Sequence, residues 1–174
     1  MWNEVRDTIL SELSDLEDAA GVTRVAMRLL FAGVLGGLLG YQREHQGKSA
    51  GLRTHVLVAM GSATFALVPQ LAGASPNDMT RVVQGIVVGI GFLGAGAIVK
   101  QSGNGEIIGL TTAAGIWMTA AIGMSAGYGR EMTATLSTLF ALAALALLPH
   151  LAPKRVATTS EAQPPSQERE SQVM

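Results

Sequence analysis

The sequence lacks cysteine and has few charged residues. Without cysteine, the 174-residue chain can form no disulfide, thiolate metal site or cysteine nucleophile. Asp, Glu, Lys and Arg make up 14% of the residues, whereas soluble domains carry roughly 25%. The 12 basic residues do not outnumber the 13 acidic ones, so nucleic acid is not expected as a partner.

The few charges are spread unevenly along the chain. Asp, Glu, Lys and Arg are absent from residues 54–77, 82–99, 107–129 and 132–153. Each of these stretches reaches the roughly 18 residues that a bilayer-spanning helix needs. A fifth apolar stretch contains Arg24 and Arg28 near its start. We therefore predict an all-α, polytopic membrane protein with five transmembrane helices in residues 22–151, at about 22–41, 54–73, 82–99, 107–127 and 132–151.

The two ends of the chain differ from this apolar centre. Residues 1–21 combine apolar residues at helical spacing with many acidic ones, which predicts an amphipathic helix lying along the membrane. Residues 152–174 are polar and rich in Pro, Ser, Gln and Glu, so we expect a disordered cytoplasmic tail.

Basic residues outside the spans predict the orientation. Five spans place six of them on one side, namely Arg43, Lys48, Arg53, Lys100, Lys154 and Arg155. Four lie on the other side, namely Arg24, Arg28, Arg81 and Arg130. Because basic loops stay in the cytoplasm, we expect the N-terminus outside and the C-terminus inside.

Gly89, Gly91 and Gly94 in "GIGFLGAGAIV" have the G-x-G-x-x-G spacing of a dinucleotide-binding turn. That fingerprint requires a preceding strand and an acidic residue about 20 positions later. Here an apolar run leads into the glycines, and no carboxylate lies at that distance. We therefore expect no cofactor and interpret these glycines mainly as helix-packing positions, with a broken helix lining an ion site as the alternative.

Small residues recur at helical spacing throughout the apolar stretches. In lipid, such residues let helix backbones approach closely, so Gly89→Leu and Gly94→Leu are expected to wedge helices apart. The predicted packing positions are Gly33, Gly36, Gly37, Gly40, Gly85, Gly89, Gly91, Gly94, Gly96, Gly115 and Gly123.

The loop after the first span is the most polar segment between spans. In one interpretation, its basic residues fix the topology and snorkel to the interface, and have no further role. Alternatively, they form a polar cluster at the mouth of the bundle, with Arg53 and His55 on either side of Thr54. In that case Arg53→Ala should impair function more than Arg43→Ala.

Candidate functional residues also occur elsewhere. Asp78 and Arg81 are spaced to pair across one helical turn, and Thr111, Thr112 and Trp117 lie in the fourth apolar stretch. No metal site or catalytic pair is expected. The full set of candidates is Arg43, Glu44, Arg53, Thr54, His55, Asp78, Arg81, Thr111, Thr112 and Trp117.

Three motifs together carry a family resemblance over roughly residues 24–150. "AGLRTHVLVAMG" (50–61), "GIGFLGAGAIV" (89–99) and "GLTTAAGIWMTAAIGMSAGYG" (109–129) resemble the MgtC/SapB family of bacterial inner-membrane proteins. The resemblance implies five spans, a cytoplasmic C-terminus and a role in adaptation to low magnesium. In pathogens it implies survival inside macrophages and control of membrane energetics.

The chain departs from the family pattern at two places. Where the family often has Glu-Arg after the first span, this sequence has Gln42-Arg43 followed by Glu44. Some members carry a folded cytoplasmic C-terminal domain, whereas this chain has a short tail. A function that needs that domain is expected to be absent or supplied by a partner.

Two functions follow from these observations. The first is a non-enzymatic regulator in the bacterial inner membrane, which binds other membrane proteins or a second copy of itself under magnesium limitation. The alternative is a transporter of magnesium or another cation. No Asp or Glu lies inside a span, although cation pathways commonly use them. Magnesium would be a signal in the first case and a substrate in the second.

Overall fold

The computed structural model describes residues 1–12, 19–100 and 107–151. Helices account for most of these residues, and the short antiparallel strands β1 (Val99–Lys100) and β2 (Ile107–Ile108) form a hairpin between two of them. The helices in the described ranges are α1 (Trp2–Glu12), α2 (Ala19–His45), α3 (Leu52–Leu71), α4 (Pro76–Gly96), α5 (Leu110–Gly127) and α6 (Glu131–Leu151).

The prediction of a helical membrane protein is confirmed, but five spans are not. Four of the helices in the described ranges, α2, α3, α4 and α6, are long and apolar enough to cross a membrane. The fifth predicted span corresponds to α5, which carries no charged residue but contains many Gly, Thr and Ser residues. Small and hydroxyl-bearing residues suit a helix that packs mainly against protein, and half of the 18 residues of α5 are buried.

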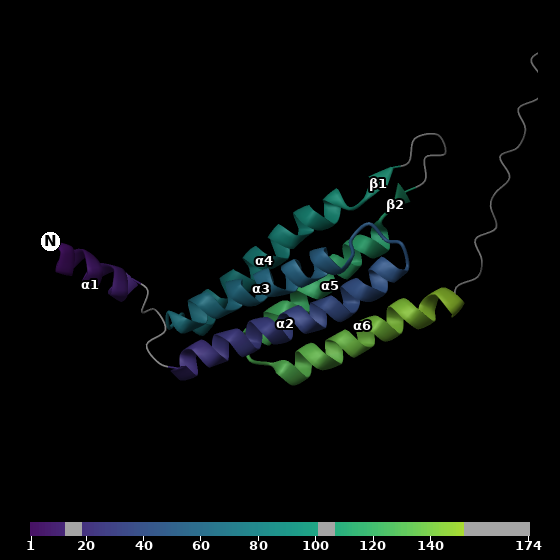
Figure 1. Ribbon diagram of the computed structural model, residues 1–174. Coiled ribbons are helices and arrows are strands. Elements are labelled where there is room, and N and C mark those ends of the chain that lie inside the picture. The colour runs from purple at the N-terminus through teal and green to yellow at the C-terminus, as the bar shows by residue number, and fades with distance from the viewer. Residues whose placement is uncertain (13–18, 101–106, 152–174) are drawn as a thin grey trace, which may run out of the picture.

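Helices α2 to α6 form an elongated bundle in which successive helices run in opposite directions (Figure 1). α5 contacts α2, α3, α4 and α6, so it is the central helix. One buried core joins α2, α3, α5 and α6 around Leu39, Ala59 and Ile122, and a second joins α4 and α5 around Ile90 and Ile116. α1 lies apart from the bundle in the same view.

Local sequence signals fix the ends of two helices. Ser75 precedes α4 and its hydroxyl accepts a hydrogen bond from the Asp78 backbone N–H, while Pro76 occupies the first turn. Gly109 precedes α5 with a φ of 91°, in the left-handed region that favours glycine. A Cβ at Gly109 would also collide with the carbonyl group of Ala97.

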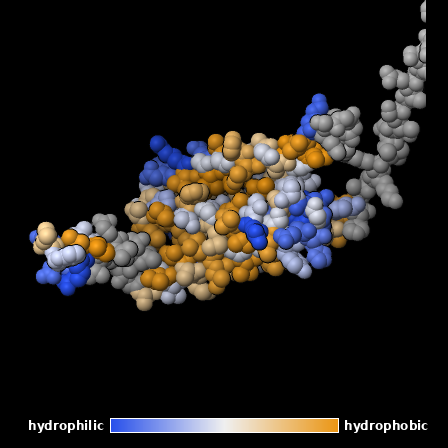
Figure 2. Space-filling model, turned by 45° about the horizontal axis from the view of Figure 1, so that its top comes forward, coloured by the Kyte–Doolittle hydropathy of each residue, from blue (hydrophilic) through white to orange (hydrophobic). Residues whose placement is uncertain are grey.

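On the face shown in Figure 2, polar residues gather towards the two ends of the bundle, and the surface between them is mostly apolar. α2 ends, α3 begins and α6 ends at the end that carries the β-hairpin (Figure 1). We call this the hairpin end. Arg43, Lys48, Arg53 and Lys100 belong to it, as the charge count grouped them.

Several boundaries differ from the sequence predictions. α1 ends at Glu12, and α2 begins at Ala19 and extends to His45, beyond the predicted span of 22–41. α4 begins at Pro76, because the Ser75–Pro76 cap sets its start. The predicted tail, 152–174, lies outside the described residues.

Candidate functional site

The backbones of α2, α3 and α5 approach one another closely, and glycine residues permit this close approach. A Cβ added at Gly36 of α2 would lie 2.6 Å from the Ala59 Cβ of α3. A Cβ at Gly123 of α5 would lie 2.7 Å from the Ala59 Cα. Ala59 is therefore enclosed between two glycines, and these positions allow no larger residue without moving a helix.

The other predicted packing glycines fall into two groups. In the first group, an added Cβ would contact another helix. At Gly40 it would lie 2.7 Å from the Leu52 Cα, as tight a contact as at Gly36. Ordinary side-chain contacts, at 3.4–3.7 Å, would form at Gly33, Gly37, Gly94 and Gly115. The second group has no described atom within 4 Å of an added Cβ, and consists of Gly85, Gly89, Gly91 and Gly96. For this second group, packing inside the described chain is not observed.

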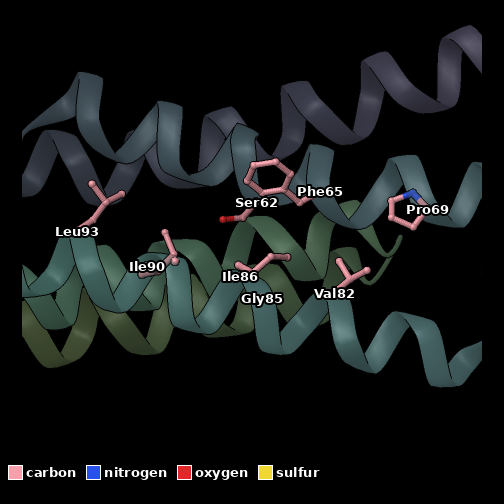
Figure 3. Close-up of a pocket in the computed structure, with 9 residues that line it drawn as sticks. Ser62, Phe65, Pro69, Val82, Gly85, Ile86, Ile90 and Leu93 are labelled. Carbon is pink, nitrogen blue, oxygen red and sulfur yellow. The ribbon is translucent and has the colours of Figure 1, made fainter.

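Gly85 and Gly89 line an open groove between α3 and α4, which we call the α3–α4 groove (Figure 3). Its volume is about 610 Å³. Phe65 on its α3 side is 63% exposed. The lining is apolar except for the Ser62 hydroxyl, and comprises Ser62, Phe65, Pro69, Val82, Gly85, Ile86, Gly89, Ile90 and Leu93.

Arg43 is a buried cation at the hairpin end, with 2% of its surface exposed. Its Nη2 donates to Thr112 Oγ1 of α5 and its Nη1 donates to Gln46 Oε1, both at 3.4 Å. These hydrogen bonds are long. Among the described residues, Arg43 Nε has no hydrogen-bond partner, and neither has the neighbouring Gln42 Oε1. The guanidinium is thus buried with little compensation.

His55 is the second buried ionisable residue of this region, at 1% exposure. Its Nδ1 lies 2.9 Å from the Gly51 carbonyl oxygen, which can only accept, so Nδ1 carries a proton. Nε2 faces Gly115 of α5. Of the predicted cluster around Thr54, only His55 is buried, because Arg53 and Thr54 are exposed. The buried arginine of this region is Arg43.

Glu44 has a structural contact that the sequence did not indicate. Its Oε2 accepts a hydrogen bond at 2.7 Å from the backbone N–H of Leu52, the first residue of α3. Gly51, which precedes α3, offers no capping side chain, and a Cβ there would lie 2.6 Å from Glu44 Oε2. The carboxylate therefore replaces the missing cap.

At the opposite end, Arg28 connects three helices. Its Nη1 donates to Gln70 Oε1 of α3 at 2.7 Å and to the carbonyl oxygen of Gly127, the last residue of α5, at 3.0 Å. Arg24, one turn earlier, is exposed. The sequence placed both arginines near the start of an apolar stretch and did not separate them, although a charge inside such a stretch is itself a signal of a polar contact.

The remaining candidates lie apart from this region. Asp78 accepts a hydrogen bond from the Ser75 hydroxyl at 2.6 Å, and no ion pair to Arg81 is seen within the described ranges. Trp117 is 50% exposed and lines a small cavity against α4. Thr111 is exposed, whereas Thr112 is buried beside Arg43.

Metal-ligand residues do not converge in the described part of the chain. No three or more His, Cys, Asp or Glu residues lie close enough there to hold one ion.

Sequence comparison gives the family. The MgtC family model matches residues 29–153. Protein SrpB of Synechococcus elongatus is 45% identical over 132 residues, which cover 70% of this chain and 72% of SrpB. Protein MgtC of Brucella abortus is 44% identical over 127 residues, covering 73% and 52%. "Putative magnesium transporter YhiD" of Escherichia coli is 46% identical over 110 residues, covering 59% and 50%.

The chain thus spans about half the length of the Brucella and Escherichia relatives. No solved structure matches it. The resemblance carried by the three glycine-containing motifs is confirmed by the match over residues 29–153, and the chain belongs to the MgtC family of membrane proteins.

Proposed function

We propose that the protein is a non-enzymatic regulator in the bacterial inner membrane, which supports adaptation to low magnesium by binding other membrane proteins. The α3–α4 groove is the observation that carries this proposal. Gly85 and Gly89 are one helical turn apart and open to the groove. This spacing of small residues suits the close approach of a helix from a partner protein in lipid.

In this proposal α5 is a fifth span. It lies among the four long apolar helices and antiparallel to its sequence neighbours (Figure 1). Five spans place the N-terminus outside and the hairpin end in the cytoplasm, by the excess of basic residues there. The α3–α4 groove then faces the lipid, where another membrane protein can reach it.

Transport of magnesium or another cation is the second candidate. Buried polar side chains on α3 and α5 favour it, since His55, Ser62, Thr112 and Thr119 lie inside the apolar bundle. The name of the Escherichia relative, "Putative magnesium transporter YhiD", points the same way. Against it, Arg43 places a positive charge beside Thr112, and this charge would repel a divalent cation.

A matched pair of α4 variants tests the regulator proposal. Gly89→Leu fills the groove, whereas Gly91→Leu adds the same side chain at a position that is open but outside the groove. We expect the Gly89 variant to fold normally but to lose growth in low magnesium, and the Gly91 variant to retain it. Equal growth of both folded variants would contradict groove binding.

Magnesium flux into proteoliposomes containing the purified chain separates the two candidates. Regulation predicts no saturable flux from folded protein. Saturable flux that Thr112→Val reduces, with Thr111→Val as the exposed neighbouring control, would replace the regulator proposal with transport.

A further inference from the structure

Two adjoining cavities form a groove on the side of the bundle that faces α6. The first, of about 670 Å³, is at the hairpin end and is lined by Arg43, Gln46, Lys48, Thr111, Ala144, Leu145, Leu148 and Pro149. The second, of about 310 Å³, shares Thr111, Ala144 and Leu145 with the first. We call the two together the α6 groove.

The α6 groove has one polar end and one apolar end. Arg43 and Lys48 are at the polar end, and the walls opposite them come from apolar residues of α6. Beyond the shared residues, the second cavity continues mainly between apolar side chains such as Leu39, Met118 and Phe140, and the buried His55 also lines it. The groove therefore combines positive charge and a long apolar surface.

Arg43 lacks a partner that would offset the cost of burying its charge. A buried cation is destabilising unless an anion or several good hydrogen bonds compensate it. Arg43 has two long hydrogen bonds to neutral groups and an unpaired Nε among the described residues. The adjacent carboxylate, Glu44, binds the N-terminus of α3 instead. The site thus suits an anion that is not part of the described chain.

Two further features add positive potential at the same place. Lys48 lines the cavity with Arg43. α5 begins at Leu110, immediately before Thr111 and Thr112, so the positive end of its helix dipole lies at this end of the groove. The Thr111 hydroxyl can donate to an anionic oxygen in the cavity that it lines.

We propose that the α6 groove binds an anionic phospholipid. Its phosphate lies at Arg43 and Lys48, and one acyl chain runs along the second cavity towards Phe140. A free phosphate ion would satisfy the cations but would leave the apolar walls empty. A lipid satisfies both, and it is already present where the groove opens on the surface of membrane-crossing helices. This inference goes beyond the regulator proposal and holds whether or not that proposal does.

The test is lipid binding to the purified full-length chain in a neutral detergent, followed by native mass spectrometry and by the shift in thermal unfolding. Phosphatidylglycerol is compared with phosphatidylcholine, which has the same phosphate and chains but no net charge. We expect phosphatidylglycerol to bind roughly tenfold more tightly, with a matching stabilisation. Equal binding of the two lipids would overturn the proposal.

Variants locate the site. Lys48→Gln and Arg43→Met should remove the preference for phosphatidylglycerol, and Arg53→Gln, an exposed cation at the same end but outside the groove, should retain it. If Arg43→Met does not fold, Lys48→Gln decides the matter alone. Retention of the full preference by Lys48→Gln would contradict the assignment of the phosphate.

The acyl-chain position has its own matched pair. Ala144 lines both cavities, whereas the neighbouring exposed Ala143 lines neither. Ala144→Phe should weaken phosphatidylglycerol binding and Ala143→Phe should not; equal effects would overturn the proposed path. Inorganic phosphate is the last arm. Stabilisation by millimolar phosphate without stabilisation by phosphatidylglycerol would show a site for a soluble anion and refute the lipid proposal.

Discussion

The Glu44 carboxylate accepts a hydrogen bond from the backbone N–H of Leu52 across the turn between α2 and α3, at 2.7 Å. The first N–H groups of a helix have no acceptor within it, and the positive end of the helix dipole attracts an anion there. A side chain from the preceding helix thus caps α3, because Gly51 cannot. This contact fixes how the chain turns at the hairpin end.

Glu44→Ala should lower the stability of the purified protein by about 1 kcal/mol, the usual effect of losing a cap. Glu44→Gln keeps an acceptor oxygen without the charge and should lose less. Thermal unfolding in detergent measures both. An unchanged melting temperature for Glu44→Ala would mean that water replaces the carboxylate without loss.

The contact between Gly123 and Ala59 predicts that two Gly→Ala substitutions have opposite effects on stability. Gly123→Ala places a Cβ against the Ala59 backbone, and overpacking of this kind costs about 1–3 kcal/mol. Gly61→Ala, in α3, meets no described atom within 4 Å and should stabilise the helix by up to about 1 kcal/mol. The two variants should therefore shift the melting temperature in opposite directions.

Glycine spacing predicted that helices pack closely but could not identify which glycines do so. Gly36 and Gly89 look alike in sequence, since each has a glycine four residues away. Gly36 is pressed against Ala59, whereas Gly89 opens to the α3–α4 groove. Spacing defines a helix face, but the neighbour of that face depends on the arrangement of the whole bundle.

The same distinction changes the expected effects of two leucine substitutions in α4. Gly94 is buried with its added Cβ 3.7 Å from the Ala113 Cβ, so Gly94→Leu should separate α4 from α5 and destabilise the protein. Gly89→Leu enters open space and should leave stability unchanged. Unfolding measurements on both variants compare them directly, and destabilisation by Gly89→Leu would restore the expectation drawn from the sequence alone.

Arg28 and Arg24 form another matched pair, one turn apart on α2. Arg28 donates to Gln70 and to the C-terminal carbonyl of Gly127, and hydrogen bonds to charged groups contribute about 1.5–3 kcal/mol. Arg28→Ala should therefore lower the melting temperature clearly. Arg24→Ala, at an exposed position, should not. Equal effects of the two substitutions would show that Arg28 contributes through charge at the membrane surface alone.

Polar residues could be located at the hairpin end from the sequence, but their burial could not. Arg43 and Arg53 both border apolar stretches, and composition gives no reason to separate them. The structure does so because α2 continues to His45, which carries Arg43 inward against Thr112, while Arg53 lies on the outer side of the first turn of α3. On burial the structure singles out Arg43, whereas the sequence analysis expected Arg53 to matter more for function if the loop forms a polar cluster.

Arg43 should prove important for lipid binding but not for stability. A buried charge with little compensation is often replaced by an apolar side chain of similar size at no loss of stability, or with a gain. Arg43→Met should therefore keep or raise the melting temperature of lipid-free protein, while the preference for phosphatidylglycerol is lost. Arg53→Met should change neither. If Arg43→Met unfolds the protein, the guanidinium is a structural link between α2 and α5, and its two long hydrogen bonds matter more than their geometry suggests.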